Sequence, residues 1–261
     1  MEIVILPDTT SAGELIGQAI TDLLRENPAA VLGLATGSSP LPIYDDLAAR
    51  FDRGEVSFAR ATAFTLDEYV GLEADHPERY ANVIRREFTS RVDFADDAVH
   101  GPDGLADDLA AAGPSYDAAI VAAGGVDLQI LGIGTDGHIA FNEPSSSLAS
   151  RTRIKTLTPQ TREDNARFFD GDIDAVPTHC LTQGLGTIME ARHVVLIADG
   201  AAKAEAVRQL AEGAVSAFWP ATILQHHPHV TVVIDEAAAS RLQLADYYRH
   251  VYASKPTWQG V

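Results

Sequence analysis

Residues 31–53 read VLGLATGSSPLPIYDDLAARFDR, and this stretch joins a short apolar segment to an amphipathic one through a turn. Val31 to Ala35 predicts a buried strand, whereas Leu41 to Arg53 has the three- and four-residue spacing of a helix. A second short apolar run follows at Thr62 to Leu66. Strand, helix and strand in succession are typical of a parallel sheet with crossover helices packed on its faces.

The same alternation extends along the chain in both directions. Further strands are expected at Ile3 to Leu6, Leu128 to Ile133, His193 to Ile197 and Val230 to Ile234. Further helices are expected at Ala12 to Glu26, Pro77 to Phe88, Leu105 to Ala123, Lys203 to Ala211 and Ala237 to Arg249. Arg151 to Leu157 is expected to be an additional strand or an extended arm near the sheet's edge. The sequence therefore predicts a doubly wound α/β fold in one domain, residues 1–261, with its ligand beyond the carboxyl ends of the strands.

Acidic residues outnumber basic ones by 37 to 19, which gives the 261-residue chain a formal net charge of −18. They are spread along the chain rather than gathered in one tail. Such a field repels polyanions, so the composition argues against nucleic acid as a partner and requires any phosphate site to be a local cluster of cations.

The single cysteine, Cys180, excludes an internal disulfide, suits a reducing compartment and is expected to be a small buried hydrophobe. The first residues lack the basic start and apolar stretch of a signal peptide. No apolar run approaches the roughly 20 residues that cross a bilayer. We therefore expect a cytoplasmic protein without membrane contact.

A polar turn, Thr36, Gly37, Ser38 and Ser39, follows the Val31 to Ala35 strand. Free backbone amides, hydroxyls and the start of the next helix can hold an anion, so this turn is a candidate phosphate cradle. The alternative is an ordinary turn capped by Ser39. The turn has neither the GKS or GKT ending of the Walker pattern nor GxGxxG, so nucleotides gain no support.

Two carboxylates, Asp67 and Glu68, stand where the Thr62 to Leu66 strand ends. Asp67 is a candidate general base, because doubly wound sheets place ligands at the carboxyl ends of their strands. The alternative is a solvated loop acid.

The glycine loop, residues 132–144, contains Asp136, His138 and Glu143 within eight residues. This pattern can hold an imidazole between two carboxylates and so favours proton transfer to a ligand. Metal binding is the competing interpretation, but the chain has no HExxH motif and no paired cysteines. The histidines around Pro228 are expected to mark a helix end and a turn, so we expect no metal.

Six basic residues follow the glycine loop: Arg151, Arg153, Lys155, Arg162, Arg167 and, later, Lys203. In an acidic chain this concentration indicates anion binding, since Arg grips phosphate oxygens in pairs and Lys adds a point charge. Surface charge balance is the alternative. No GxSxG elbow is present, which disfavours nucleophilic catalysis.

Several separated motifs, in order, resemble the glucosamine-6-phosphate deaminase family from about Leu32 to Asp235. They are LATGSSP at residues 34–40, LDEYVG at 66–71, GTDGHIAFNEP at 134–144 and SSSLASRTRIKTLT at 145–158. Sugar-phosphate lactonases of the same superfamily typically continue the loop with ASLFP, whereas this chain has AFNEP with Glu143. The resemblance therefore favours the deaminase over those lactonases or isomerases.

The resemblance implies a Rossmann-like fold and a hydrolase-type reaction without a cofactor. Glucosamine 6-phosphate and water would give fructose 6-phosphate and ammonia. Asp67 would carry the C2 proton to C1. His138, supported by Asp136 and Glu143, would open the sugar ring. Phosphate contacts would fall on the Thr36–Ser39 turn, Arg167 and Lys203.

Some members of the family are hexamers activated by N-acetylglucosamine 6-phosphate, so a homo-oligomer is possible here. The positions of their activator site are matched here by Ser146, Arg153, Lys155 and Thr156. Activated members also have a tyrosine near the C-terminus, where this chain has Arg249, and Tyr248 is the residue that would substitute for it.

A non-catalytic sugar-phosphate sensor is the rival hypothesis from another class of protein. Only about 30 residues precede the phosphate turn, which leaves no room for the helix-turn-helix of such regulators.

Overall fold

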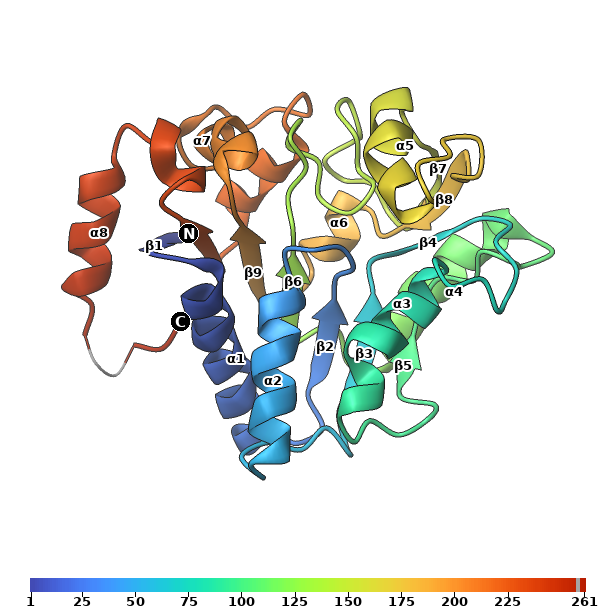
Figure 1. Ribbon diagram of the computed structural model, residues 1–261, viewed down its shortest axis with the longest axis horizontal. Coiled ribbons are helices and arrows are strands. Elements are labelled where there is room, and N and C mark those ends of the chain that lie inside the picture. Colours follow the sequence, from blue (N-terminus) through green and yellow to red (C-terminus); the bar gives the residue numbers. More distant parts are fainter. Residues whose placement is uncertain (257–258) are drawn as a thin grey trace.

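The computed structural model describes residues 1–256 and 259–261, and a seven-stranded sheet runs through its centre (Figure 1). Every neighbouring pair of its strands is parallel. In spatial order the strands are β1 (Glu2–Leu6), β10 (Val230–Asp235), β9 (His193–Ala198), β6 (Leu128–Leu131), β2 (Val31–Leu34), β3 (Thr62–Thr65) and β5 (Val99–His100). All residues of β2, β6 and β9 are buried, because helices cover the sheet on both sides.

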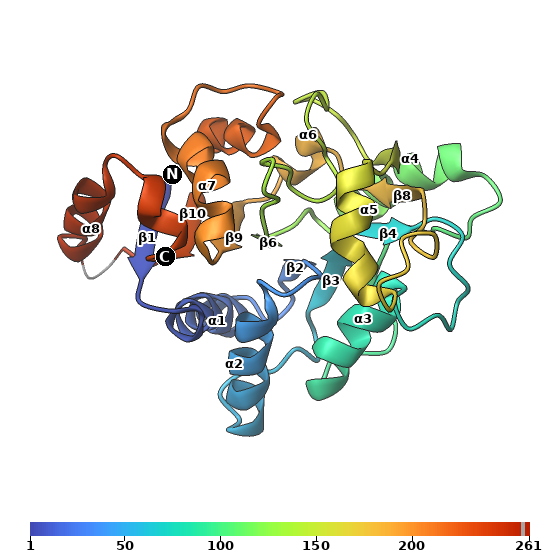
Figure 2. The ribbon, with the colours of Figure 1, turned by 45° about the horizontal axis from the view of Figure 1, so that its top comes forward.

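Figure 2 shows one group of helices below the sheet and another on its opposite side. The first group is α1 (Thr9–Glu26), α2 (Leu41–Asp52) and α3 (Tyr80–Glu87). The second is α4 (Leu109–Ala122), α6 (Leu185–Ile188) and α7 (Ala204–Glu212). The sequence of α1 explains why it is a helix packed on the sheet. Asp8 caps its start, and Ile16, Ile20 and Leu24, four residues apart, lie on its buried face. The predicted doubly wound, Rossmann-like fold is confirmed.

A second, antiparallel sheet lies beside the carboxyl end of β3 and consists of β4 (Asp67–Tyr69), β8 (His179–Thr182) and β7 (Arg153–Thr156). The strand expected at Arg151 to Leu157 therefore exists, but not at the edge of the main sheet. The segment is a strand, but it pairs with β8 away from the main sheet. Its side chains alternate between half-buried and exposed, as in an antiparallel sheet with one solvated face.

The helix expected at Ala237 to Arg249 is wrong as a single element. The chain forms a 3-10 turn at Ala238–Arg241, becomes extended at Leu242, and then starts α8 (Ala245–Ala253). The carboxylate of Glu212 at the end of α7 accepts the backbone N–H groups of Gln243 and Leu244, both at 2.9 Å. These bonds replace the helical ones and break the helix there. None of the described helices is long and apolar enough to cross a membrane.

Candidate active site

Four loops meet at the edge of the sheet where β2, β3, β6 and β9 end, the upper edge in Figure 1. They are the turn after β2, the β3–β4 junction, the glycine loop after β6 and residues 199–203 after β9. The carboxyl ends of parallel strands share one edge, so the sequence motifs converge although they are far apart along the chain.

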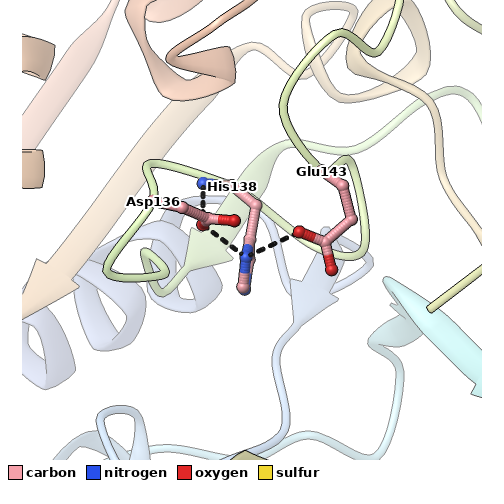
Figure 3. Close-up of side chains that lie close together, drawn as sticks. All are labelled: Asp136, His138 and Glu143. Atoms are coloured by element: carbon pink, nitrogen blue, oxygen red, sulfur yellow. Dashed lines mark hydrogen bonds and ion pairs between the residues drawn. The ribbon is translucent and has the colours of Figure 1, made fainter. Parts of the chain in front are cut away.

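Asp136, His138 and Glu143 come together in the glycine loop (Figure 3). His138 Nδ1 lies 2.7 Å from Asp136 Oδ1 and 3.6 Å from Glu143 Oε2. The backbone N–H of His138 also donates to Asp136 Oδ1 at 3.1 Å. Nδ1 is aligned with neither carboxylate as a hydrogen bond requires, so charge and proximity hold the imidazole between them.

The surroundings of the ring determine its charge. Burial disfavours the imidazolium, but Asp136 and then Glu143 outweigh that effect and raise the pKa of His138 to about 9. Burial likewise acts against the charge of Asp136, yet the pKa of its carboxyl is held well below the usual range by His138. The His138 imidazole is therefore protonated at neutral pH and lies between two carboxylates. The other edge of the ring is left for a ligand.

Glycines make room for this arrangement. A Cβ on Gly134 would lie 2.3 Å from Cε1 of His138, so the ring packs directly on the Gly134 backbone. Gly137 has a φ of +81°, and a Cβ there would meet the ring of Trp219 at 2.7 Å. Ala140, with φ at +50°, shows that the loop also stores backbone strain, as functional loops often do.

Asp67 begins β4 and is 7% exposed. Burial, followed by the charge of Glu68, raises its pKa to about 8, while His138 acts in the opposite direction. No described residue donates a hydrogen bond to the Asp67 carboxylate. The neighbouring Glu68 accepts the backbone N–H groups of Tyr69, Tyr80 and Ala81 at 2.9 to 3.0 Å, so Glu68 anchors the start of α3.

The turn after β2 is open at the start of α2. Gly37 has a φ of +101°, and Ser39 donates to Asp199 Oδ1 at 3.0 Å. The alternative in which Ser39 caps the helix is therefore wrong, since Pro40 occupies the cap position without a side-chain bond. Thr36 and Gly37 are partly exposed and Ser38 is exposed, so this turn is accessible.

Lys203 lies near Asp199, which accepts the Ser39 hydroxyl of this turn, and near Arg167. Burial lowers the pKa of Lys203; Asp199 opposes the shift, and the charge of Arg167 adds to it. The guanidinium of Arg167 lies 4.7 Å from the centre of the Phe168 ring. Among the described residues neither cation forms an ion pair. These two cations, near an accessible helix start, are a candidate anion site.

Two arginines of the expected cluster, Arg151 and Arg162, have structural partners. Arg151 pairs with Asp117 at 2.9 Å and Glu190 at 2.6 Å. Arg162 donates to the carbonyls of Ile173 and Val176. The expected anion cluster therefore divides, and these two arginines are not available to a ligand.

Three of the four residues matched to the activator site lie in β7, and Ser146 follows the glycine loop. Ser146 is buried, and its hydroxyl has no hydrogen-bond partner among the described residues. Arg153 donates to Asn142 Oδ1 at 3.0 Å. Arg153 and Lys155 alternate with the exposed Thr156 along the strand, so Thr156 points to the opposite face.

Asp136, His138 and Glu143 form the only metal-sized group of ligand atoms among the described residues, all within 4.8 Å of one another. The proton on His138 already provides a cation between these carboxylates.

The histidines near Pro228 lie, as expected, at a helix end and turn. His227 Nε2 contacts the Ala191 carbonyl at 2.7 Å, and the ring of His229 stacks on that of His193.

Sequence reasoning missed the residues that hold Glu143. They lie at the start of α5 (Pro159–Asn165), where Thr161 donates to Glu143 Oε1 and the cap residue Thr158 lies 3.5 Å from the same oxygen. The signal was available, because Thr158 before Pro159 has the pattern of a capped helix start. Its connection to Glu143 is tertiary and leaves no local pattern.

Comparison with known proteins places these features in one family. Residues 9–233 match the model of glucosamine-6-phosphate isomerases/6-phosphogluconolactonase. A Beutenbergia cavernae protein named glucosamine-6-phosphate deaminase is 72% identical over the full length of both chains, and one of that name from Mycolicibacterium smegmatis is 71% identical, also over full length. A solved structure described as a monomeric glucosamine-6-phosphate deaminase is 40% identical, with a TM-score of 0.90, and covers 92% of this chain and 100% of its own. The chain belongs to the glucosamine-6-phosphate isomerase/6-phosphogluconolactonase family.

Proposed function

We propose that this protein deaminates glucosamine 6-phosphate to fructose 6-phosphate and ammonia, as a step of amino-sugar catabolism in the cytoplasm. The observation that carries the proposal is the pairing of two sites at one sheet edge. A buried carboxylate at Asp67 is free of hydrogen bonds from described residues, and the imidazolium of His138 lies between Asp136 and Glu143. Relatives of 72% and 71% identity carry the deaminase name.

In the proposed mechanism, Lys203, Arg167 and the Thr36–Ser39 turn hold the phosphate. The imidazolium of His138 gives a proton to the ring oxygen and the C1 hydroxyl gives one to a water molecule, so the bond from C1 to the ring oxygen breaks and the aldehyde forms. Its carboxylate neighbours make the transfer reversible, because they stabilise the charged ring.

Asp67 then takes the proton from C2 and returns it to C1. The C2–H electron pair moves into an enolamine, and protonation at C1 gives a C2 imine. Water adds to this imine carbon, and ammonia leaves as the C2 carbonyl forms. A buried carboxylate suits this shuttle, since its raised pKa makes it a stronger base once ionised.

The activator site remains a separate proposal from sequence. Ser146, Arg153, Lys155 and Thr156 would hold N-acetylglucosamine 6-phosphate. Tyr248, the possible substitute for the missing tyrosine, instead contacts Glu212 Oε1 at 3.4 Å. The missing tyrosine disfavours activation. A steady-state assay with and without N-acetylglucosamine 6-phosphate tests activation, and a mass measurement in solution tests a homo-oligomer.

The decisive test is ammonia release from glucosamine 6-phosphate by the purified protein, with fructose 6-phosphate measured in parallel. Solved lactonases such as that of Trypanosoma cruzi, at 19% identity and a TM-score of 0.73, share the fold. Hydrolysis of 6-phosphogluconolactone without ammonia release would therefore favour that alternative. Binding of the sugar phosphate without any product would favour a sensor.

A further inference from the structure

Glu143 differs from its two partners in how it is held. Asp136 and His138 are fixed by their own loop, through the bond from the His138 backbone to Asp136 and the contact of the ring with Gly134. The side chain of Glu143 receives no such bond from the glycine loop. Its Oε2 atom faces His138 and has no hydrogen-bond partner among the described residues, whereas Oε1 points to α5.

The hydroxyls at the start of α5 form a directed chain. Thr158 Oγ1 accepts the backbone N–H of Thr161 at 3.1 Å and donates to Thr161 Oγ1 at 2.9 Å. Thr161 then donates its single hydroxyl proton to Glu143 Oε1. Each hydroxyl has one proton, so the order of donors is determined, and the carboxylate is the final acceptor.

From these contacts we infer that Thr161 is a positioning residue, which turns the Glu143 carboxylate so that Oε2 faces the His138 imidazole. This inference rests on the proposed function only for its kinetic consequence. The terminal torsion of a glutamate is broad, so without a donor at Oε1 the carboxylate can rotate away from the ring. Both Thr161 and Glu143 are buried, and water cannot readily replace the lost donor.

The placement of α5 does not depend on this bond. At its other end Asn165 donates to the Tyr69 hydroxyl at 2.9 Å, and Arg162 donates to the carbonyls of Ile173 and Val176. The 3-10 turn Ala166–Phe168, which carries Arg167, continues directly from the helix. Loss of the Thr161 hydroxyl should therefore disturb Glu143 while Arg167 and the phosphate contacts stay in place.

The test compares Thr161→Val, which removes the hydroxyl at nearly constant volume, with Thr161→Ser, which retains it. We expect the valine variant to lower kcat about 10-fold, as for one lost bond to a charged group, with KM changed less than about twofold. The serine variant should restore most of kcat. The matched control is Thr187→Val, since Thr187 is equally buried and donates to the carboxylate of Asp117, away from the site. It should keep the kcat of the parent.

A double-mutant cycle makes the inference sharper. If Thr161 acts through Glu143, adding Thr161→Val to Glu143→Gln should slow that variant no further. The inference would be overturned by an unchanged kcat in Thr161→Val, by a serine variant as slow as the valine variant, or by the same slowing with and without Glu143→Gln. A rise in KM alone would also do so, because it would mean that α5 and Arg167 had moved.

Nuclear magnetic resonance separates this inference from the proposed function. The charged groups facing the His138 ring are Asp136, Glu143 and Asp67. Thr161→Val should lower the pKa of His138 below that of the parent, and Thr187→Val should not. A parent protein without ammonia release would disprove the deaminase function, whereas an unshifted His138 in Thr161→Val would disprove the positioning role.

Discussion

Asp67 and Glu68 are adjacent in β4 and have opposite environments: three backbone N–H groups bind the Glu68 carboxylate, and no described residue donates to that of Asp67. Burial raises the pKa of both side chains, and that of Asp67 reaches about 8. A buried carboxyl group without donors is costly to the fold in its ionised form, so the environment of Asp67 favours a role in chemistry over a role in stability.

Asp67→Asn should abolish exchange of the C2 proton with solvent while phosphate binding stays largely intact, because the amide cannot take up a proton. Deuterium incorporation at C2, followed by magnetic resonance in heavy water, measures the first effect, and inorganic phosphate titration measures the second. Exchange at the parental rate would remove Asp67 from the role of base.

The same substitution should stabilise the fold at alkaline pH. The folded-state pKa of Asp67, about 8, lies above its ordinary value of 3.8, so the unfolded chain loses this proton first and stability falls as pH rises between these values. Asparagine has no proton to lose. Asp67→Asn should therefore exceed the parent by about 5 kcal/mol in free energy of unfolding at pH 8 and nearly match it at pH 4. Denaturant titrations at the two pH values measure this difference.

Glu68→Gln is the matched comparison, since it neutralises the adjacent carboxylate. It removes one of the two acceptor oxygens at the start of α3 and should lower the free energy of unfolding by about 1–3 kcal/mol. C2 exchange should persist in the folded protein. A Glu68→Gln protein that is stable but cannot exchange the C2 proton would reverse the roles assigned to the two acids.

The pH dependence of kcat/KM should be bell-shaped with its maximum between pH 8 and 9. Asp67 must be ionised to accept the C2 proton, so activity rises through its pKa of about 8. His138 must be protonated to open the ring, so activity falls above its pKa of about 9. Asp136→Asn removes a carboxylate that stabilises the imidazolium, and it should move the alkaline limb to lower pH without moving the acid limb.

Local patterns were sufficient for six of the seven strands of the main sheet, all except the two-residue β5, and for much of the site. The β2 and β6 strands are short apolar runs bounded by glycine-containing turns, and Asp136, His138 and Glu143 lie within eight residues of one another. Residues this close in sequence stay near one another whatever the position of the loop in the fold. The position of Asp67 was predictable too, because it directly follows a buried strand of a parallel sheet.

Long-range contacts account for the errors. The three-residue β4 is too short to show a period, and its partner β8 lies more than 100 residues away. The helix predicted through Leu242 is broken by the Glu212 carboxylate, which comes from α7. The structural role of Glu68 depends on the backbone of Tyr80. None of these contacts leaves a mark in the local sequence.

Lys203→Met should raise KM for the sugar phosphate about 10- to 100-fold, as expected for one charge-assisted contact, with a smaller effect on kcat. Arg60→Met removes the same charge from an exposed position before β3, at the opposite edge of the sheet, and should leave KM unchanged. Steady-state kinetics on the pair separates a phosphate ligand from a general effect of net charge. Equal KM values in both variants would exclude Lys203 as a ligand.

Gly134→Ala should disable the site without unfolding the protein. A Cβ at Gly134 would meet Cε1 of His138 at 2.3 Å, and the ring must swing away from Asp136 and Glu143 to accept it. We expect kcat to fall about 10- to 100-fold, since small misplacements of a catalytic group are costly. Gly132→Ala, in the same loop, meets no atom within 4 Å. By magnetic resonance the pKa of His138 should drop in Gly134→Ala and stay near 9 in Gly132→Ala, and equal values would show that the ring does not depend on the space at Gly134.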